Sequence, residues 1–384
     1  MDENSFRKNH IRYAIALLNS YEGSIPLHLY LKEYFSKNRK HGSNDRKAIT
    51  ALCYGYFRVA NGFKNTSNRE EIISAGQALV VTHSFNETYE QIIDRLKNAL
   101  RVNADQFSIE TNYPFSEFLS QKIDKAALLY SFLIQPNLFI RIRPGQRERV
   151  VEILNVHEWQ YQPIAPRTIA LPNSTPVQHL FKSDKEVVIQ DYASQLTGAL
   201  LTQLPCQRSG IKIWDCCAGS GGKTIQLFDT FPESAITASD KRKTILQNLK
   251  ARLKNAGITN CDIRLADLSQ SADDFPNDTF DLILADVPCS GSGTWSRTPE
   301  QLHYFPKSSL VSYQYLQRRI ITNVLPKLKP GGFILYITCS VFSAENEENI
   351  FYFENELGLR TISSEYIEGS RKRADTLFAV LLQK

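Results

Sequence analysis

Two cysteines lie in short polar segments that could carry nucleophilic chemistry. Cys289 stands in a Pro-Cys-Ser sequence just after Asp286, and Cys339 stands in a Thr-Cys-Ser sequence. Each segment follows an apolar, strand-like run, at residues 280–285 and 333–337. An isolated cysteine is most often a small buried hydrophobe. A cysteine at the end of a strand, between small polar residues, can instead be exposed and activated as a thiolate.

A pair of thiols beside an acid suits methylation of a pyrimidine. Carbon 5 of cytosine is a poor nucleophile until a thiolate adds at carbon 6 and turns the ring into an enamine. Asp286 could hold or protonate the N3/N4 edge of the base, and the activated carbon could then take a methyl group from a sulfonium donor. From the residues alone, Cys289 of the Pro-Cys-Ser sequence is the more attractive nucleophile.

A glycine-rich turn between a strand and a helix predicts a cofactor site. It follows the apolar residues 211–214 and precedes the helix-like residues 225–228. Glycines let the backbone turn sharply and approach a nucleotide-like cofactor more closely than a Cβ would allow. The predicted cofactor-binding residues of this turn are Cys217, Ala218, Gly219, Ser220, Gly221, Gly222 and Lys223.

Two other kinds of glycine turn fit this segment less well. The phosphate-binding loop of an NTPase needs a glycine five positions before Gly222, where Cys217 stands. Asp286 could nevertheless imitate the magnesium-binding aspartate of such an enzyme, so this alternative stays open. A dinucleotide-binding turn needs a third glycine, and Thr224 stands in its place.

Three acidic residues follow successive strand-like runs. Asp240, Asp267 and Asp286 come at or just after the ends of the runs at 235–240, 261–266 and 280–285. Ligands of an open parallel sheet bind at the carboxyl ends of its strands, so we expect these acids to share one crevice with the glycine turn. Asp240 is the candidate ligand of a ribose diol. Its alternative role is the N-cap of a helix expected after it, at 241–255.

Together these motifs resemble those of the Sun (Fmu) or RsmB-like family of S-adenosylmethionine-dependent RNA cytosine-5 methyltransferases. The Pro-Cys-Ser and Thr-Cys-Ser sequences are highly specific as a pair. The resemblance covers residues 215–223, Asp240, Asp267, residues 286–294, residues 329–341 and Glu345-Asn346. The glycine turn departs from the family at Gly219-Ser220, where the family has Ala-Pro. This change should make the free turn more flexible and raise the entropic cost of ordering it.

The resemblance implies a division of labour between the thiols. Cys339 is then the nucleophile that adds to carbon 6, and Cys289 helps to release the methylated product. The implied cofactor is S-adenosylmethionine, with Lys223 near both the cofactor and the base. The implied substrate is RNA, ribosomal RNA first and transfer RNA as the alternative. A P-loop-like NTPase and a noncatalytic RNA-binding assembly factor remain competing interpretations.

The resemblance also implies an α/β protein of three parts. Residues 1–130 are expected to form a helical NusB-like domain that positions RNA, and residues 131–185 a small α/β linker domain. Residues 186–384 are expected to form a Rossmann-like class I methyltransferase domain with a mostly parallel seven-stranded sheet. Apolar residues at helical spacing, and a helix start signal at Ser43, agree with the first of these assignments.

Some basic and aromatic residues outside the motifs are candidate RNA contacts. Arg58 belongs to a basic helical region, and Arg141 and Arg143 alternate with apolar residues as on an edge strand. Arginines on the wet face of a strand need no function, however. Residues 291–300 have the glycine and proline content of a mobile active-site loop. Within them, Trp295 could stack on a base or anchor the loop in the core.

The composition is that of an ordinary soluble protein. The chain has 384 residues, of which 42% are hydrophobic and 22% charged, and a net charge of +5 is too small to indicate nucleic-acid binding by itself. Seven cysteines without paired metal spacing favour reduced thiols and no bound metal, which predicts a cytoplasmic protein. We find no secretory signal or bilayer-length apolar run, and we expect a monomer without membrane contact.

Overall fold

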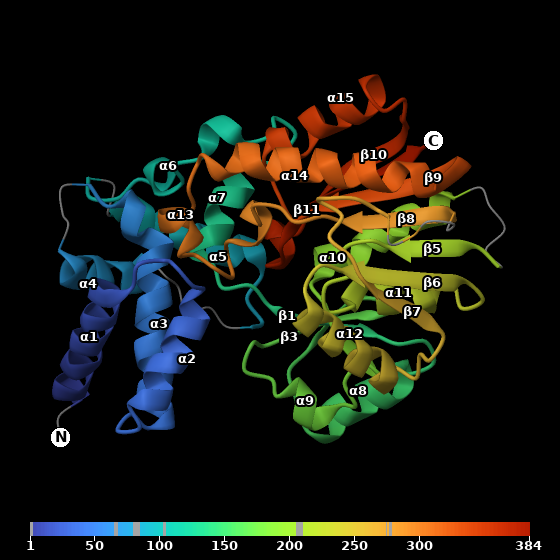
Figure 1. The fold of residues 1–384 in the computed structure, drawn as a ribbon. Coiled ribbons are helices and arrows are strands. Elements are labelled where there is room, and N and C mark those ends of the chain that lie inside the picture. The colour runs from blue at the N-terminus through green and yellow to red at the C-terminus, as the bar shows by residue number, and fades with distance from the viewer. Residues whose placement is uncertain are drawn as a thin grey trace.

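The computed structural model describes residues 3–64, 68–79, 85–102, 105–204, 210–273, 275 and 279–384. Three parts follow one another along the chain: a helical domain, a small four-stranded sheet with two helices, and a seven-stranded sheet covered by helices on both faces (Figure 1). This is the α/β arrangement that the sequence predicts. None of the described helices combines the length and the apolar character needed to cross a bilayer.

The helical domain packs around one apolar core. Its helices are α1 (Glu3–Ser20), α2 (Leu27–Lys37), α3 (Ser43–Val59), α4 (Arg69–Leu79), α5 (Tyr89–Val102), α6 (Ile109–Asn112) and α7 (Lys125–Leu133). Helix α3 begins at the predicted Ser43, where the Asp45 carboxylate accepts a hydrogen bond from the Gly42 amide at 2.9 Å. At α7 the N-cap residue itself is the acceptor: the Asp124 carboxylate accepts a hydrogen bond from the Ala127 amide at 3.1 Å. These caps satisfy amides that a helix start leaves without partners.

The small domain is an antiparallel sheet in the strand order β2-β3-β1-β4. Its elements are β1 (Leu138–Ile142), α8 (Arg147–Val156), β2 (Gln162–Ala165), β3 (Thr168–Leu171), α9 (Val177–Leu180) and β4 (Val187–Ile189). Strand β4 lies beyond the boundary predicted at residue 185, and it pairs with β1. The small sheet therefore ends directly before α10 (Tyr192–Leu196), the first helix of the large domain.

The prediction that Arg141 and Arg143 could line an RNA groove is wrong. Both guanidinium groups bind the carboxylate of Asp229 in α11 (Gly222–Thr230), and the side chains of Arg141 and Asp229 are only 5% and 3% exposed. Arg167 binds the same carboxylate. A buried carboxylate needs several donors to offset the loss of hydration. These arginines therefore join the small domain to the large one.

The large domain is built on seven strands in the order β10-β11-β9-β8-β5-β6-β7. The strands are β5 (Lys212–Asp215), β6 (Ala235–Asp240), β7 (Cys261–Leu265), β8 (Phe280–Asp286), β9 (Leu328–Thr338), β10 (Arg360–Glu368) and β11 (Thr376–Gln383). The five neighbouring strands from β9 to β7 are parallel to one another. Strand β11 runs antiparallel to both of its neighbours, β9 and β10, so β10 runs in the same direction as the five. The mostly parallel seven-stranded sheet is therefore confirmed.

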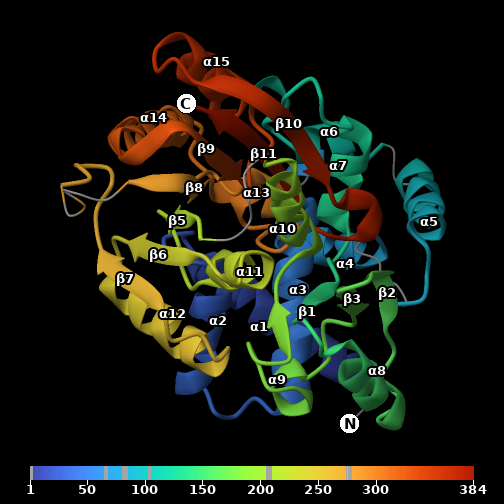
Figure 2. The ribbon, with the colours of Figure 1, turned by 90° about the vertical axis from the view of Figure 1, so that its right-hand side faces the viewer.

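Helices cover both faces of this sheet (Figure 2). Helices α10, α11 (Gly222–Thr230) and α12 (Lys243–Asn255) lie on one face, and α14 (Ser309–Val324) and α15 (Glu347–Asn355) lie on the other. The inner strands are buried almost throughout, β9 from Phe333 to Thr338 for example. Burial on both faces explains why these strands are continuous apolar runs instead of alternating ones.

The topology places a crevice at the carboxyl edge of the sheet. The chain moves from β5 to β6 on one side, whereas β8 pairs with β5 on the other side, so the strand order reverses between β5 and β8. Ligands of doubly wound sheets bind outside such a reversal. The arrowhead of β8 points toward the helical domain, so this edge faces the rest of the molecule (Figure 1).

The segment after Cys289 is held by the helical domain. Arg58 is buried at 4% exposure, and its guanidinium donates to the backbone oxygens of Phe132, Ile134 and Ser296 at 2.8, 3.2 and 2.7 Å. Burial lowers the pKa of Arg58 to about 10, so the group stays charged at neutral pH. The prediction of an RNA-facing Arg58 is therefore wrong, because the side chain ties two domains together.

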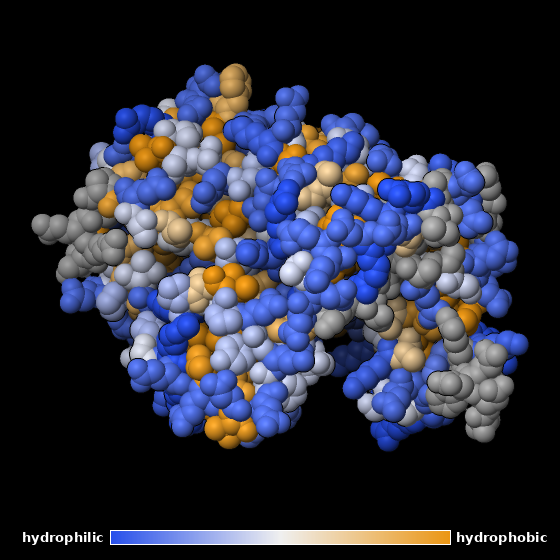
Figure 3. All heavy atoms as spheres, turned by 180° about the vertical axis from the view of Figure 1, so that it is seen from behind, coloured by the Kyte–Doolittle hydropathy of each residue, from blue (hydrophilic) through white to orange (hydrophobic). Residues whose placement is uncertain are grey.

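Further contacts join the helical domain to the same segment. The Leu27 amide donates to Glu300 Oε1 at 3.1 Å, and Tyr304 Oη donates to the Tyr21 backbone oxygen at 2.8 Å. Seen from behind, a hollow separates the lower parts of the helical domain and the small domain (Figure 3). A cavity of about 830 Å³ lies between them, lined by α3, by residues 172–174 and by Ser296 and Arg297.

Candidate active site

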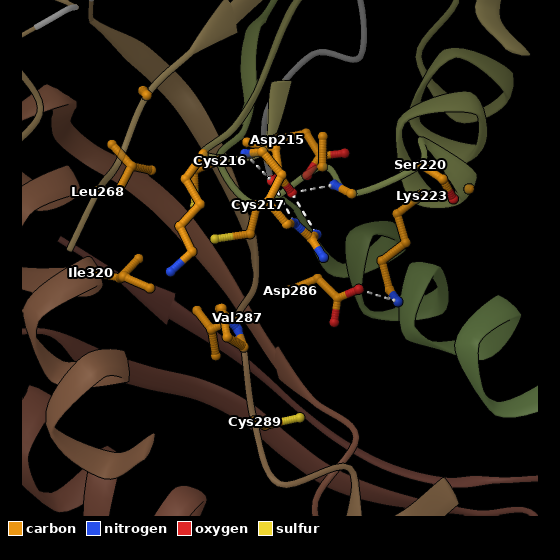
Figure 4. A pocket seen from close by; sticks show the side chains of 18 of the residues that line it. Asp215, Cys216, Cys217, Ser220, Lys223, Leu268, Asp286, Val287, Cys289 and Ile320 are labelled. Carbon is orange, nitrogen blue, oxygen red and sulfur yellow. Dashed lines mark hydrogen bonds and ion pairs between the residues drawn. The ribbon is translucent and has the colours of Figure 1, made fainter. Parts of the chain in front are cut away.

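A cavity of about 470 Å³ opens at the carboxyl edge of the large sheet, where the topology predicts one (Figure 4). Its wall includes the glycine turn after β5, the ends of β6 and β8, and one side of α14. All the predicted site residues line it except Gly221, which lies behind the turn. They are Cys217, Ala218, Gly219, Ser220, Gly222, Lys223, Asp240, Asp267, Asp286, Cys289 and Cys339.

The glycine turn needs glycine at two positions. Gly219 and Gly221 have φ values of +53° and +90°, in the left-handed region that side chains disfavour. A Cβ at Gly221 would also lie 2.2 Å from Leu249 Cδ1 in α12. Gly219 is one of the two residues that depart from the family pattern, and its positive φ explains why glycine suits this place. The turn then leads into α11, which begins at Gly222.

Asp240 is a buried acceptor at the end of β6. Its carboxylate accepts hydrogen bonds from the Gly219 amide at 3.1 Å and from the Arg242 amide and guanidinium at 2.9 Å. Burial works to raise the pKa of Asp240, but the hydrogen bonds from Arg242 outweigh it and the pKa is lowered. The alternative of a helix N-cap is wrong: α12 begins at Lys243, with Arg242 at the cap position.

Asp267 lies at the outer rim of the cavity. The hydroxyl and amide of Ser269 donate to its carboxylate at 2.6 and 3.1 Å. The hydroxyl in particular lowers the pKa of Asp267, which keeps this exposed carboxylate charged. A charged acceptor at this edge is suited to a ligand that carries amino or hydroxyl donors.

Asp215 is a site residue that the sequence interpretation did not single out. It ends β5 beneath the glycine turn and is fully buried, with Thr224 Oγ1 donating to Oδ2 at 2.6 Å. Its Oδ1 has no hydrogen-bond partner among the described residues. Burial raises the pKa of Asp215 to about 7. The only sequence signal is its place at the start of the motif, directly after an apolar run.

Lys223 points from the first turn of α11 to Asp286 at the end of β8 (Figure 4). Its Nζ atom lies 2.8 Å from Asp286 Oδ2 and 3.0 Å from Ser194 Oγ. Burial works to lower the pKa of Lys223, but the Asp286 carboxylate outweighs it and the pKa is raised. The ion pair keeps Asp286 as an acceptor beside the thiols. Lys223 is thus paired with a carboxylate of the protein itself, whereas the corresponding lysine of an NTPase binds the phosphates of the nucleotide.

The two thiols meet at the end of the cavity. Cys289 Sγ and Cys339 Sγ are 3.1 Å apart, and the Cys339 amide donates to Cys289 Sγ at 3.3 Å. Both side chains are partly exposed. The hydrogen bond with Cys339, together with burial, raises the pKa of Cys289 well above its ordinary value. The Lys223 ammonium also interacts electrostatically with Cys339.

Residues 291–300 form an ordered, packed segment, so the prediction of a mobile loop is wrong. Trp295 is 1% exposed, donates to the Ser290 backbone oxygen and packs against Phe115, Phe305 and Phe342. Of its two predicted roles, the core anchor is therefore the correct one. Sequence alone could not decide this, because the partner rings come from distant segments.

The described residues also bear on the predictions about metal and thiols. No group of three or more acidic, histidine or cysteine side chains that could hold a metal ion occurs among them. The six described cysteines are free, and the seventh, Cys206, lies outside the described residues.

Residues 202–373 match the model of a family described as 16S rRNA methyltransferase RsmB/F. A ribosomal RNA small subunit methyltransferase B from Xylella fastidiosa is 32% identical over 222 residues, which are 56% of this chain and 51% of the relative. A probable ribosomal RNA small subunit methyltransferase B from Synechocystis is 27% identical over 308 residues, or 77% and 65% of the two chains. The chain thus spans about half to two thirds of the length of these relatives.

Solved structures show a similar fold. The crystal structure of PH0851 superposes with a TM-score of 0.67 at 18% identity, covering 100% of this chain and 99% of that one. A methyltransferase homolog from Pyrococcus horikoshii gives a TM-score of 0.57 at 19% identity, covering 75% of this chain and 98% of the other. At these identities the likeness concerns the fold alone.

Proposed function

Because residues 202–373 belong to the 16S rRNA methyltransferase RsmB/F family, we propose that this chain transfers a methyl group from S-adenosylmethionine to carbon 5 of a cytosine in RNA. The observation that carries the proposal is the meeting of two partly exposed thiols, 3.1 Å apart, in the cavity that also holds the glycine turn and Asp240. The curated relatives are named for the small ribosomal subunit, so its RNA is the first substrate to test.

The residues of the cavity fit S-adenosylmethionine. Asp240 offers a charged acceptor at the end of β6, where a ribose diol is held in folds of this kind. The turn at Gly219 and Gly221 keeps the backbone free of side-chain bulk on the way to α11. When bound, the sulfonium group supplies the methyl group. Cys217, Asp267 and Lys223 line the rest of the cavity.

Cys339 is the nucleophile in this proposal. Its thiolate adds to carbon 6 of the cytosine, and the electron pair moves to carbon 5, which then accepts the methyl group. Loss of the proton from carbon 5 and expulsion of the thiolate restore the aromatic ring. Lys223 stabilises the thiolate before the attack and after the release, because its ammonium interacts with both Cys339 and Asp286.

Asp286 and Cys289 complete the machinery. The Asp286 carboxylate, which lies 2.8 Å from Lys223 Nζ, accepts a hydrogen bond from the exocyclic amine of cytosine and so selects cytosine over uracil. Cys289 retains its proton at neutral pH because its pKa is raised. A neutral thiol in contact with the departing Cys339 can assist the release of the product without competing for carbon 6.

The test is methylation of purified RNA by the purified chain. We expect tritium transfer from labelled S-adenosylmethionine to small-subunit ribosomal RNA taken from cells that lack this protein, and a 5-methylcytosine at one position on sequencing. Transfer RNA serves as the competing substrate, and preferred labelling of it would reassign the RNA. A thermal-shift comparison separates the remaining class, since an NTPase would be stabilised by ATP and not by S-adenosylmethionine.

A further inference from the structure

The buried carboxylate of Glu345 bridges the two cysteine segments. Glu345 closes a short helical turn, Ser343–Glu345, and is 0% exposed. No lysine, arginine or histidine of the described residues forms an ion pair with it. Burying a carboxylate without a cation costs several kcal/mol unless hydrogen-bond donors replace its hydration. The chain therefore devotes several donors to this one group.

The donors come from residues next to both cysteines. Glu345 Oε1 accepts from the Ser290 amide and from Gln317 Nε2, each at 2.9 Å. Oε2 accepts from the Ser290 hydroxyl at 2.5 Å and from the Ser340 hydroxyl. Ser290 directly follows Cys289, and Ser340 directly follows Cys339. One side chain thus fixes two segments that lie 50 residues apart.

A web of serine hydroxyls strengthens this bridge. Ser340 Oγ lies 3.1 Å from both Ser290 Oγ and Ser292 Oγ, and the Val341 amide donates to Ser292 Oγ at 3.0 Å. The Gly293 amide donates to the Cys339 backbone oxygen at 3.0 Å. All three serines are buried, so water does not compete for these bonds. The separation of the thiols follows from this shared network.

Other groups hold the backbone at Glu345. Its backbone oxygen accepts from Tyr336 Oη at 2.7 Å and from Asn349 Nδ2 at 3.3 Å. These bonds fix the start of α15 without using the carboxylate. The carboxylate itself is directed at the cysteine segments and at Gln317 of α14. Its loss should therefore affect the thiols before it affects the local fold.

We propose that Glu345 is the positioning residue that holds the Cys289 and Cys339 segments at a fixed separation, so that both thiols reach the same base. The role of the thiols rests on the proposed function, whereas their separation does not. The Glu345 carboxylate interacts electrostatically with Cys289, and the Lys223 ammonium interacts electrostatically with Cys339. Position and charge together distinguish the two cysteines.

Diamide crosslinking tests the position without RNA or cofactor. Diamide takes up the two hydrogens of a thiol pair and leaves a disulfide, whose rate of formation depends on how often the sulfurs meet. Peptide mapping identifies the Cys289–Cys339 bond among the other cysteines. We expect Glu345→Ala to slow this crosslink by about tenfold or more, in line with the loss of several hydrogen bonds to a charged group. Loss of the negative charge of Glu345 by itself would speed the crosslink, because a cysteine without a neighbouring carboxylate forms its thiolate more readily.

Glu345→Gln separates position from charge. The amide has the same shape, and the serine hydroxyls can rotate to accept from it, so we expect the crosslink to form at least as fast as in the parent chain. In a Cys339→Ala background, Glu345→Gln should raise the rate of Cys289 alkylation by iodoacetamide at pH 7 about threefold or more, since the neighbouring negative charge is gone. Glu348→Gln, at an exposed position in the first turn of the following helix α15, is the matched control and should change neither rate.

A folded Glu345→Ala chain that crosslinks at the parent rate would overturn the proposal. If that variant does not fold, Glu345→Asp replaces it: the shorter carboxylate cannot reach both segments, and an unchanged crosslink would contradict the proposal equally. If the parent chain methylates no RNA but Glu345→Ala still slows the crosslink, the proposed function fails and the positioning role stands.

Discussion

The cofactor turn and the thiol pair share one cavity, but they are held in different ways. The turn at Cys217–Lys223 is positioned by its own neighbours in the chain, β5, α11 and the end of β6. The thiol pair joins two segments 50 residues apart, which are bridged by Glu345 together with Gln317, and the segment after Cys289 is held by Arg58 of the helical domain at Ser296. In the proposed function, binding of the methyl donor therefore depends on local structure, whereas placement of the nucleophile depends on contacts between distant parts of the chain.

The largest effect on methyl transfer is expected from a substitution in the thiol pair, Cys289 and Cys339. Cys339→Ala should reduce methyl transfer by at least about a thousandfold, because without a thiolate carbon 5 is not activated. Binding of S-adenosylmethionine should stay within about threefold of the parent value, since the sulfur is not needed to form the glycine turn. Filter binding of tritiated RNA and calorimetry measure the two quantities. Retained turnover would reassign the nucleophile.

A substitution beside the glycine turn should weaken binding of S-adenosylmethionine and leave the thiol pair unchanged. Asp240→Asn should weaken binding of S-adenosylmethionine by about 10-fold to 100-fold, because a charged acceptor contributes about 1.5–3 kcal/mol. The diamide crosslink of Cys289 and Cys339 should not change. Asp262→Asn, at an exposed position on the neighbouring strand β7, is the control. An altered crosslink in Asp240→Asn would break the distinction between the glycine turn and the thiol pair.

Arg58→Met tests whether the helical domain supports the thiol pair. Three backbone oxygens would lose a donor, and we expect the free energy of unfolding to fall by about 2 kcal/mol or more. The apparent kcat should fall while the affinity for S-adenosylmethionine stays unchanged. Denaturant titration measures the free energy of unfolding, and calorimetry measures the affinity for S-adenosylmethionine. Lys47→Met, on an exposed position of the same helix α3, should leave both unaltered.

The smallest effect concerns the pH dependence of stability. The pKa of Asp215 is raised from 3.8 to about 7 in the folded chain, so between these values the folded state keeps a proton that the unfolded state releases. Stability should therefore fall as the pH rises from about 4 to about 7. Asp215→Asn should reduce this slope, as seen in thermal melts over that range. Part of the slope should remain in this variant, because the pKa of Asp375 is also raised to about 7. An unchanged slope would show that Asp215 does not titrate there.

Periodicity and motifs predicted the parts of the molecule that depend on neighbouring residues. Strands β6, β8 and β9, the start of α3 and the glycine turn follow from short patterns of apolar residues, caps and glycines. The acids at the strand ends converge because parallel strands share one edge. The resemblance to a known family supplied the predicted roles of the two thiols and reversed the choice of Cys289 as nucleophile that the residues alone favoured.

Partners that are distant in the sequence could not be predicted. The sequence shows that Arg58 and Arg141 are charged, but no neighbouring residue indicates their partners. Arg58 binds backbone carbonyl oxygens and Arg141 binds Asp229, both inside the protein. Trp295 offered two roles until its aromatic neighbours were known. Glu345 stood in a recognised motif without a role, because its function lies in joining two serines from different strand ends.

The most direct measurement is a denaturing gel of the Cys289→Ala chain incubated with labelled substrate RNA and S-adenosylmethionine. If Cys339 attacks the base and Cys289 assists release, the RNA should migrate as a covalent protein adduct, and the adduct should vanish in the Cys289→Ala, Cys339→Ala double variant. Normal methylated product without an adduct, or an adduct that persists in the double variant, would contradict the two-thiol mechanism.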